Sequence, residues 1–238
     1  MRLFGKRNIS PLEVDLHSHI IPNIDDGSQS VADSIEMILS LKKLGYKKII
    51  TTPHIHPRYP NTPEVIMAGY HLIQDEIRKR SIEMEVEVAA EYFVDEVFSE
   101  KLERGDRILS FGDKYVLVES SFVNKPFFFE SVMFDLISQG YKPVLAHPER
   151  YEFLEGRITW LEELKDTGVL LQVTIGSIGG YYGSEPEKLG RTLLKKNMVD
   201  FLGSDMHRMR HLAFLEKGLK SREVQQAIAE GRIRNSEL

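Results

Sequence analysis

Cysteine is absent from this sequence of 238 residues. Its absence excludes disulfide bonds, metal sites built on thiolates and every reaction that depends on a sulfur nucleophile. Long apolar runs are also missing, so we expect no segment that spans a membrane. Any reaction that this protein catalyses must therefore use nitrogen and oxygen side chains.

An excess of positive charge is missing too, because the formal net charge is -5. This balance argues against a general electrostatic grip on nucleic acid, and we expect no nucleic-acid partner. A content of 42% hydrophobic and 28% charged residues is typical of a soluble globular protein, and the length suits one domain over residues 1–238. Residues 1–12 begin with a basic stretch that lacks the apolar middle of a signal peptide, which predicts a solvated N-terminal tail and a cytoplasmic protein.

Apolar stretches that resemble buried strands recur along the chain, at a segment ending near Asp15 and then at 48–52, 84–90, 115–118, 143–146, 169–174 and 199–203. Amphipathic helical patterns separate them, at 31–44, 62–80, 94–104, 126–139, 156–167, 186–197 and 221–230. Because these strands have no alternating polar face, we expect both of their faces to be buried in a parallel sheet. The order predicts an α/β fold, a single-domain (β/α)7 barrel of the TIM type, with an open doubly wound sheet as the alternative.

Side chains that can bind metals follow every predicted strand except 169–174; they are His17, His19, His54, Glu91, Glu119, His147, Asp205 and His207. Each one alone has an ordinary explanation, such as a salt bridge, a turn or a helix cap. In a parallel barrel, however, the C-terminal ends of all strands meet on one face, where active sites form. Their repetition at strand ends therefore predicts one shared metal site.

The number of these side chains exceeds what a single ion needs, because zinc usually takes four ligands in all. Two or three divalent ions fit better, and mixed nitrogen and oxygen ligands suit manganese, iron or zinc more than magnesium or calcium. Several ions held close together activate water and stabilise both oxygens of an in-line displacement at phosphorus. The leading chemistry is therefore hydrolysis of a phosphate ester.

Arginines near these residues are candidates for binding phosphate. Arg150 lies three residues after His147 and could hold phosphate oxygens in bidentate fashion. Arg208 and Arg58 are weaker candidates for contact with phosphate or peptide. Tyr181 and Tyr182 could border an aromatic substrate, although core packing is the commoner use of such residues.

Several short stretches together resemble the polymerase and histidinol phosphatase (PHP) superfamily, and within it the bacterial manganese-dependent protein-tyrosine phosphatases of the CpsB/CapC/YwqE type. The matching stretches are Asp-Leu-His-Ser-His at 15–19, Asp-Asp-Gly at 25–27, Thr-Thr-Pro-His at 51–54, Ala-Glu at 90–91, Val-Glu at 118–119, Ala-His-Pro-Glu-Arg-Tyr at 146–151 and Ser-Asp-Met-His at 204–207. Residues 174–183 show no clear family pattern.

The resemblance implies a distorted βα barrel with a trinuclear centre, manganese being the first expectation. It implies one ion held by His17, His19, Glu91 and Asp205, a second by Glu91, Glu119 and His147, and a third by Asp26, His54 and His207. Arg150 matches the arginine of this family that binds phosphate, and Arg208 is a second candidate for that role.

The implied activity is removal of phosphate from the phosphotyrosine-containing tail of a membrane-associated bacterial tyrosine kinase that controls capsule or exopolysaccharide synthesis. We expect attack by a metal-activated hydroxide, stabilisation of charge by Arg150, and protonation of the leaving group by Asp205, His207 or water. A homo-oligomer is compatible with the sequence.

Three other functions stay open. The protein could hydrolyse a small metabolite such as histidinol phosphate, or it could be a non-catalytic module that captures phosphorylated tails. A metal-dependent amide hydrolase on a similar barrel is the third, but such enzymes commonly use a carboxylated lysine, and no lysine ends a predicted strand.

Overall fold

The computed structural model describes residues 12–154 and 158–238. The tail expected at residues 1–12 therefore lies outside the described residues, except for Leu12, which is buried in the hydrophobic core. No helix within the described ranges is long and apolar enough to cross a membrane.

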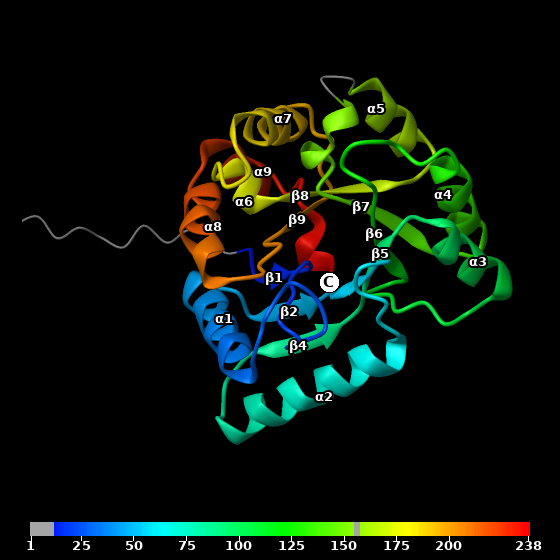
Figure 1. Ribbon diagram of the computed structural model, residues 1–238. Coiled ribbons are helices and arrows are strands. Elements are labelled where there is room, and N and C mark those ends of the chain that lie inside the picture. Colours follow the sequence, from blue (N-terminus) through cyan, green and yellow to red (C-terminus); the bar gives the residue numbers. More distant parts are fainter. Residues whose placement is uncertain (1–11, 155–157) are drawn as a thin grey trace, which may run out of the picture.

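The strands form two parallel sheets in a mixed α/β fold (Figure 1). The first sheet has the order β1 (Val14–Asp15), β2 (Lys48–Thr51) and β4 (Glu85–Val88). The second sheet has the order β3 (His54–Ile55), β5 (Glu91–Phe93), β6 (Tyr115–Glu119), β7 (Lys142–Ala146), β8 (Leu170–Thr174) and β9 (Phe201–Gly203).

Two of the predicted strands are interrupted, which is why the chain has more strands than expected. The stretch 48–52 continues past Pro53 as β3, and the stretch 84–90 continues past Ala90 as β5. Proline has no N–H to donate to a ladder, so a break at Pro53 is physically expected. The two interrupted strands stay side by side, because the Glu91 N–H donates to the Pro53 carbonyl (3.1 Å) and His54 pairs in register with Glu91. His54 and Glu91 thus lie within short strands and not after them.

The segments that follow β1 and β9 are joined by hydrogen bonds outside the two ladders. The Asp205 N–H donates to the His17 carbonyl at 2.8 Å, and the His19 N–H donates to the Met206 carbonyl at 3.1 Å. The buried Asp15 carboxylate also accepts a bond from the Ser204 N–H, at 2.8 Å. These bonds place the residues after the first and last strands next to each other.

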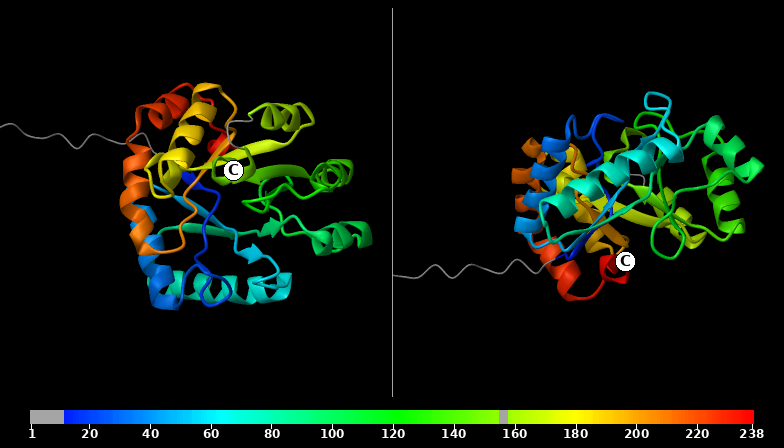
Figure 2. Two further views of the ribbon diagram at one scale, coloured as in Figure 1. Left: turned by 45° about the horizontal axis from the view of Figure 1, so that its top comes forward. Right: turned by 90° about the horizontal axis from the view of Figure 1, so that it is seen from below.

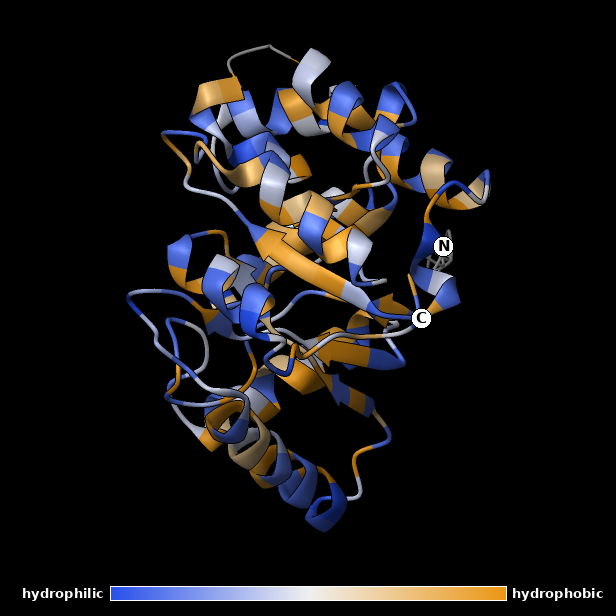
Figure 3. Ribbon diagram, turned by 90° about the vertical axis from the view of Figure 1, so that its right-hand side faces the viewer, coloured by the Kyte–Doolittle hydropathy of each residue, from blue (hydrophilic) through white to orange (hydrophobic). Residues whose placement is uncertain are grey.

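The helices surround the strands, as the views in Figure 1 and Figure 2 show. They are α1 (Val31–Leu44), α2 (Pro63–Lys79), α3 (Glu96–Arg104), α4 (Phe129–Ser138), α5 (Thr159–Asp166), α6 (Ile175–Ile178), α7 (Ser184–Lys195), α8 (Leu212–Leu219) and α9 (Arg222–Ala229). Short 3-10 turns complete the chain at η1 (Pro148–Arg150), η2 (Glu152–Leu154), η3 (Met209–His211) and η4 (Arg234–Glu237). Hydropathy follows this arrangement, with apolar strands at the centre and polar residues on the outer helices (Figure 3).

A helix lies at each of the seven predicted ranges, and local signals mark the ends of several of them. Helix α1 begins after Ser30, whose side chain accepts a bond from the Asp33 N–H, and it ends at Gly45 in the left-handed conformation. Helix α5 begins later than predicted, and the expected start at Gly156 lies outside the described residues.

Helices α6 and α8 were not predicted, and they pack closely against each other. A Cβ on Gly218 would lie 2.1 Å from the Ile175 carbonyl oxygen, and one on Gly179 would lie 2.0 Å from the Phe214 oxygen. Gly218 is the last residue but one of α8 and Gly179 follows α6, and the lack of a side chain at both positions lets the two helices approach. The contact between α6 and α8 stabilises both helices in the folded protein.

Candidate metal centre

The structure brings the predicted metal ligands together at one end of the strands. Mutually close groups of potential ligand atoms are formed by His17, His19 and Asp205, by His17, Glu91 and His147, by His54, Glu91 and Glu119, and by His19, His54 and His207. Asp26 joins them, because its Oδ1 lies 3.5 Å from Nε2 of His54 and of His207. The convergence expected from the strand ends is therefore observed.

Glu91 lies at the centre of this cluster and is completely buried. Its Oε2 lies 3.2 Å from His17 Nε2 and 3.1 Å from His54 Nδ1, and its Oε1 lies 2.9 Å from His147 Nε2. The short strand β5 fixes it there by pairing with β3 on one side and β6 on the other. A carboxylate whose two oxygens face different imidazoles has the geometry of a group that bridges two cations.

His17 and His19 direct the same ring atom toward the same space. The two Nε2 atoms are 3.2 Å apart, and Asp205 Oδ1 lies 3.3 Å from that of His17 and 3.7 Å from that of His19. The opposite ring nitrogens are engaged elsewhere: His17 Nδ1 lies 2.9 Å from Gln172 Oε1, and His19 Nδ1 lies 2.9 Å from Asp25 Oδ2. If both Nδ1 atoms donate these bonds, two Nε2 lone pairs face each other, an arrangement that a cation between them would stabilise.

Gln172 and Asp25 are functional candidates that sequence reasoning did not identify. Gln172 lies on β8, which corresponds to the predicted strand 169–174, the one without a candidate ligand at its end. Its signal was a single polar residue inside an apolar strand. Asp25 stood next to the chosen Asp26, and only the structure shows that Asp25 orients an imidazole while Asp26 faces the cluster directly.

The far side of the cluster is built around His54. Its Nδ1 lies 3.1 Å from Glu91 Oε2 and 3.1 Å from Glu119 Oε1, while its Nε2 faces Asp26. Glu119 Oε2 lies 3.9 Å from His147 Nε2. The resemblance grouped His54 with Asp26 and His207. In the structure His54 also lies 3.1 Å from both Glu91 and Glu119, so it could belong to either group of ligands.

The pKa values of His17, His19 and Glu91 are shifted in the direction opposite to the effect of burial. Burial would lower the pKa of His17, but Glu91 and Asp205 raise it, and Asp25 together with Glu91 raises the pKa of His19 to about 9 against the same effect. Burial would raise the pKa of Glu91, but His17 and His54 hold it well below its usual range. The clustered carboxylates therefore stabilise positive charge, and this donor set fits divalent cations.

Arg150 brings permanent positive charge to the edge of the cluster. Its Nη1 donates to Asp205 Oδ2 at 2.7 Å, and its guanidinium lies over the rings of Tyr182 (4.1 Å) and Phe122 (4.7 Å). The Tyr182 hydroxyl donates to the same Asp205 oxygen at 3.1 Å. Tyr182 contacts both Arg150 and Asp205, and its expected contact with an aromatic substrate stays a prediction.

A tight turn fixes the position of Arg150. His147 has a φ of 36° and precedes η1, and the next side chain but one, Glu149, is buried behind that turn. Glu149 Oε1 accepts bonds from the Thr174 N–H at 3.0 Å and from Ser177 Oγ at 2.7 Å. Burial raises the pKa of Glu149 to about 7 despite these bonds. Glu149 thereby ties η1 to β8 and α6.

The weaker sequence candidates lie at the margin. Arg208 is exposed and donates to the backbone oxygen of Asp26 at 3.3 Å, so its expected contact with phosphate stays a prediction. Arg58 and Tyr59 line a pocket of about 130 Å³ over the cluster, together with Phe122. His56 packs on Phe93 with ring centroids 4.3 Å apart.

This fold and cluster define an α/β protein whose parallel strands deliver imidazoles and carboxylates to one buried site, as in metal-dependent hydrolases. The profile of the family described as "Capsular polysaccharide synthesis, CpsB/CapC" matches residues 13–220, and the chain belongs to this family. The resemblance inferred from the short stretches is thus confirmed.

Relatives and solved structures agree with this assignment. The chain is 33% identical to tyrosine-protein phosphatase YwqE of Bacillus subtilis over 200 residues, which cover 83% of this chain and 78% of the relative. It is 28% identical to tyrosine-protein phosphatase CpsB of Streptococcus pneumoniae over 207 residues, covering 82% and 83%. A solved structure from a study of YwqE and CpsB, described as unique metal-dependent tyrosine phosphatases, superposes with a TM-score of 0.79 at 29% identity and covers 93% of this chain and 94% of that chain.

Proposed function

We propose that this chain is a metal-dependent protein-tyrosine phosphatase. The observation that carries the proposal is Glu91, buried among imidazoles, with Arg150 a short distance away beside Asp205. The relatives are named as tyrosine-protein phosphatases, which supports phosphotyrosine as the group that is hydrolysed. The substrate that fits this reading is the phosphotyrosine-containing tail of a membrane-associated bacterial tyrosine kinase in capsule or exopolysaccharide synthesis, in keeping with the family description.

The proposed centre holds two or three divalent ions, with manganese expected first and iron or zinc as alternatives. The ligands would be His17, His19, Asp26, His54, Glu91, Glu119, His147, Asp205 and His207. When bound, such ions lower the pKa of a water molecule and stabilise the oxygens of an in-line displacement at phosphorus.

The side chains of this protein have distinct tasks in the proposed reaction. The pairing of Arg150 with Asp205 uses one of its five N–H donors. The remaining N–H groups can therefore bind phosphate oxygens. Asp205 is a poor proton donor: burial would raise its pKa, but His17, His207 and Arg150 hold it well below the usual range. Water is therefore the better acid for the leaving tyrosinate, and His207 can serve only if its ring does not bind an ion. Tyrosinate is a fair leaving group without strong assistance.

The proposal includes the finer architecture. We propose that the two sheets together form a distorted (β/α)7 barrel within one domain, an arrangement supported by the hydrogen bonds between the segments after β1 and β9. A cytoplasmic location, where the tail of such a kinase would be reached, belongs to the same proposal.

The test combines metal analysis with an assay. Protein purified without chelators should contain bound divalent metal and should hydrolyse a phosphotyrosyl peptide, and Arg150→Ala should abolish turnover while metal stays bound. Arg78→Ala, an exposed arginine on α2, is the matched control and should behave as the parent does. Unchanged hydrolysis of aryl phosphates by Arg150→Ala would remove the role given to this residue.

The same assay separates the alternatives. Much faster cleavage of histidinol phosphate than of phosphotyrosyl peptide would favour a metabolite phosphatase. Tight binding of the peptide with no turnover in manganese would favour the non-catalytic capture module.

A further inference from the structure

A second hollow adjoins the candidate metal centre. It has a volume of about 700 Å³ and lies between the η1 and η2 turns and the N-terminal half of α7. The pocket over the cluster is much smaller, about 130 Å³, and Arg150 lines both. Sites that enclose a whole small ligand usually measure about 300–1,000 Å³. The smaller pocket therefore takes little more than the reacting group, and the rest of a substrate must lie outside it.

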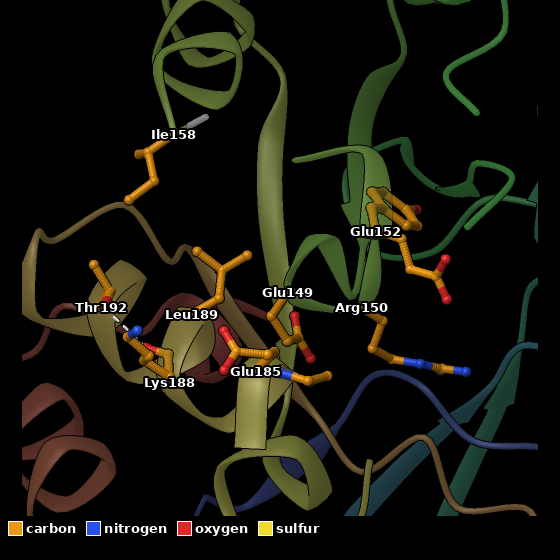
Figure 4. Close-up of a pocket in the computed structure, with 10 residues that line it drawn as sticks. Glu149, Arg150, Glu152, Ile158, Glu185, Lys188, Leu189 and Thr192 are labelled. Carbon is orange, nitrogen blue, oxygen red and sulfur yellow. Dashed lines mark hydrogen bonds between the residues drawn. The ribbon is translucent and has the colours of Figure 1, made fainter. Parts of the chain in front are cut away.

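The larger hollow, called here the flanking pocket, has an apolar wall and a polar floor. Ile158, Pro186 and Leu189 supply apolar surface, and Leu189 also packs against the hydrophobic core. Figure 4 shows Glu149, Glu185 and Leu189 grouped on one side of the η1 turn, with the Arg150 side chain extending from the other side. The η1 turn thus carries Arg150, the residue that lines both hollows.

Glu149 adds an observation that points to a ligand. Its side chain is buried, at 3% exposure, and it lines the flanking pocket. Oε1 is occupied by Thr174 and Ser177, whereas Oε2 has no hydrogen-bond partner among the described residues. A buried polar atom without a partner is costly, and because Oε2 has almost no accessible surface, a donor from a bound group satisfies it only if the pocket wall adjusts.

We propose that the flanking pocket binds the residues next to phosphotyrosine in a protein substrate, with an apolar side chain of the substrate against Leu189 and Ile158. This inference rests on the proposed function and narrows its substrate class. Because Arg150 lines both hollows, a peptide whose phosphate is held by its guanidinium has its neighbouring residues beside the flanking pocket. A free aryl phosphate has no atoms that reach the flanking pocket.

The two kinds of substrate give a direct test. The holoenzyme is assayed on p-nitrophenyl phosphate and on phosphotyrosyl peptides that carry leucine or alanine at each of the three positions on either side of the phosphotyrosine. For one of these positions, leucine should lower KM relative to alanine by about tenfold, the expected effect of burying one such side chain. Hydrolysis of p-nitrophenyl phosphate serves as the measure of an intact centre.

Variants of the pocket should remove this preference. Leu189→Asp, and Thr192→Phe as a second variant that fills the pocket, should raise KM for the leucine peptide about tenfold and leave p-nitrophenyl phosphate within about twofold of the parent. Leu72→Asp, an exposed leucine on α2 at 46% exposure, is the matched control and should change neither substrate.

The outcomes distinguish this inference from the proposed function. Equal KM values for all leucine and alanine peptides, or pocket variants that treat the leucine peptide as the parent does, would overturn the inference and leave the phosphatase standing. If the pocket variants lose activity equally on p-nitrophenyl phosphate and on the leucine peptide, the pocket acts on the phosphotyrosine itself and not on its neighbours. This result would also overturn the inference. Failure of the parent to hydrolyse any phosphotyrosyl peptide would overturn both.

Discussion

Leu117 and Glu119 are two residues apart on β6, point to the same face, and are both buried, at 0% and 4% exposure. Leu117 belongs to an apolar cluster inside the strands, formed with Val14, Leu16, Ile50, Ala89, Phe111, Tyr115, Val144, Ala146 and Phe201. Glu119 belongs to the candidate metal centre, 3.1 Å from His54. Two residues on the same face of one strand are thus buried in opposite environments, one apolar and one charged.

The two regions differ in what burial contributes to the free energy of folding. In the apolar cluster, removal of surface from water is favourable, by about 25 cal/mol for each Å². In the metal centre, burying carboxylates and imidazoles is costly, and their mutual attraction offsets that cost only partly. The apolar cluster should therefore determine stability, and the metal centre should determine activity.

Glu91→Gln should have the largest effect on activity. The amide keeps the shape of the side chain but removes the charge that His17, His54 and His147 share. We expect kcat/KM for a phosphotyrosyl peptide to fall by about 10³-fold or more, with loss of bound metal, because one charged candidate ligand is removed. Steady-state assays and metal analysis measure both quantities. An active variant with full metal content would show that Glu91 is only structural.

Arg150→Lys should have the next largest effect. Lysine keeps the charge but loses the planar fork and the stacking on Tyr182 and Phe122. We expect about a 10²-fold loss of kcat/KM at unchanged metal content, together with weaker inhibition by inorganic phosphate. Inhibition as strong as in the parent would place phosphate elsewhere. Because Arg150 also bonds Asp205, metal content is the control that separates the two roles.

Metal affinity should rise with pH. Burial would lower the pKa of His19, but Asp25 and Glu91 raise it to about 9, so the metal-free protein holds a proton that an ion must displace. Below that pKa the affinity for Mn²⁺ should therefore gain about tenfold per pH unit for this one proton, and titrations between about pH 7 and pH 8.5 measure the slope.

Asp25→Asn is the variant that tests this cause. Loss of the carboxylate should lower the pKa of His19 and flatten the slope, and it should weaken binding by about 10- to 100-fold because the imidazole loses its orienting bond. A slope equal to that of the parent would assign the displaced proton to another group.

The sequence predicts those features of the fold and of the candidate metal centre that depend on neighbouring residues. Ser30 and Gly45 delimit α1, and the apolar runs show which segments are buried strands. Burial alone does not distinguish Leu117 from Glu119, and the chemical type of the residue at a strand end had to do so. Gln172 was missed because it meets His17 from 155 residues away and no local pattern encodes that contact. Asp25 lies only six residues from His19, but the sequence does not show which of the two neighbouring aspartates faces the imidazole. Helix α8 was missed for a related reason, since Gly218 serves packing against Ile175 rather than the helix itself.

Leu117→Ala should have the smallest effect on activity and a clear effect on stability. Leu117 is completely buried in the apolar cluster, and truncation of such a leucine costs about 2–5 kcal/mol of the free energy of unfolding. Urea unfolding in the presence of metal should show this loss, while kcat/KM at low temperature should stay within about twofold of the parent, because no atom of Leu117 belongs to the ligand groups. A large loss of turnover in the folded variant would mean that packing below the metal centre sets its geometry. The separation of stability from activity along β6 would then be wrong.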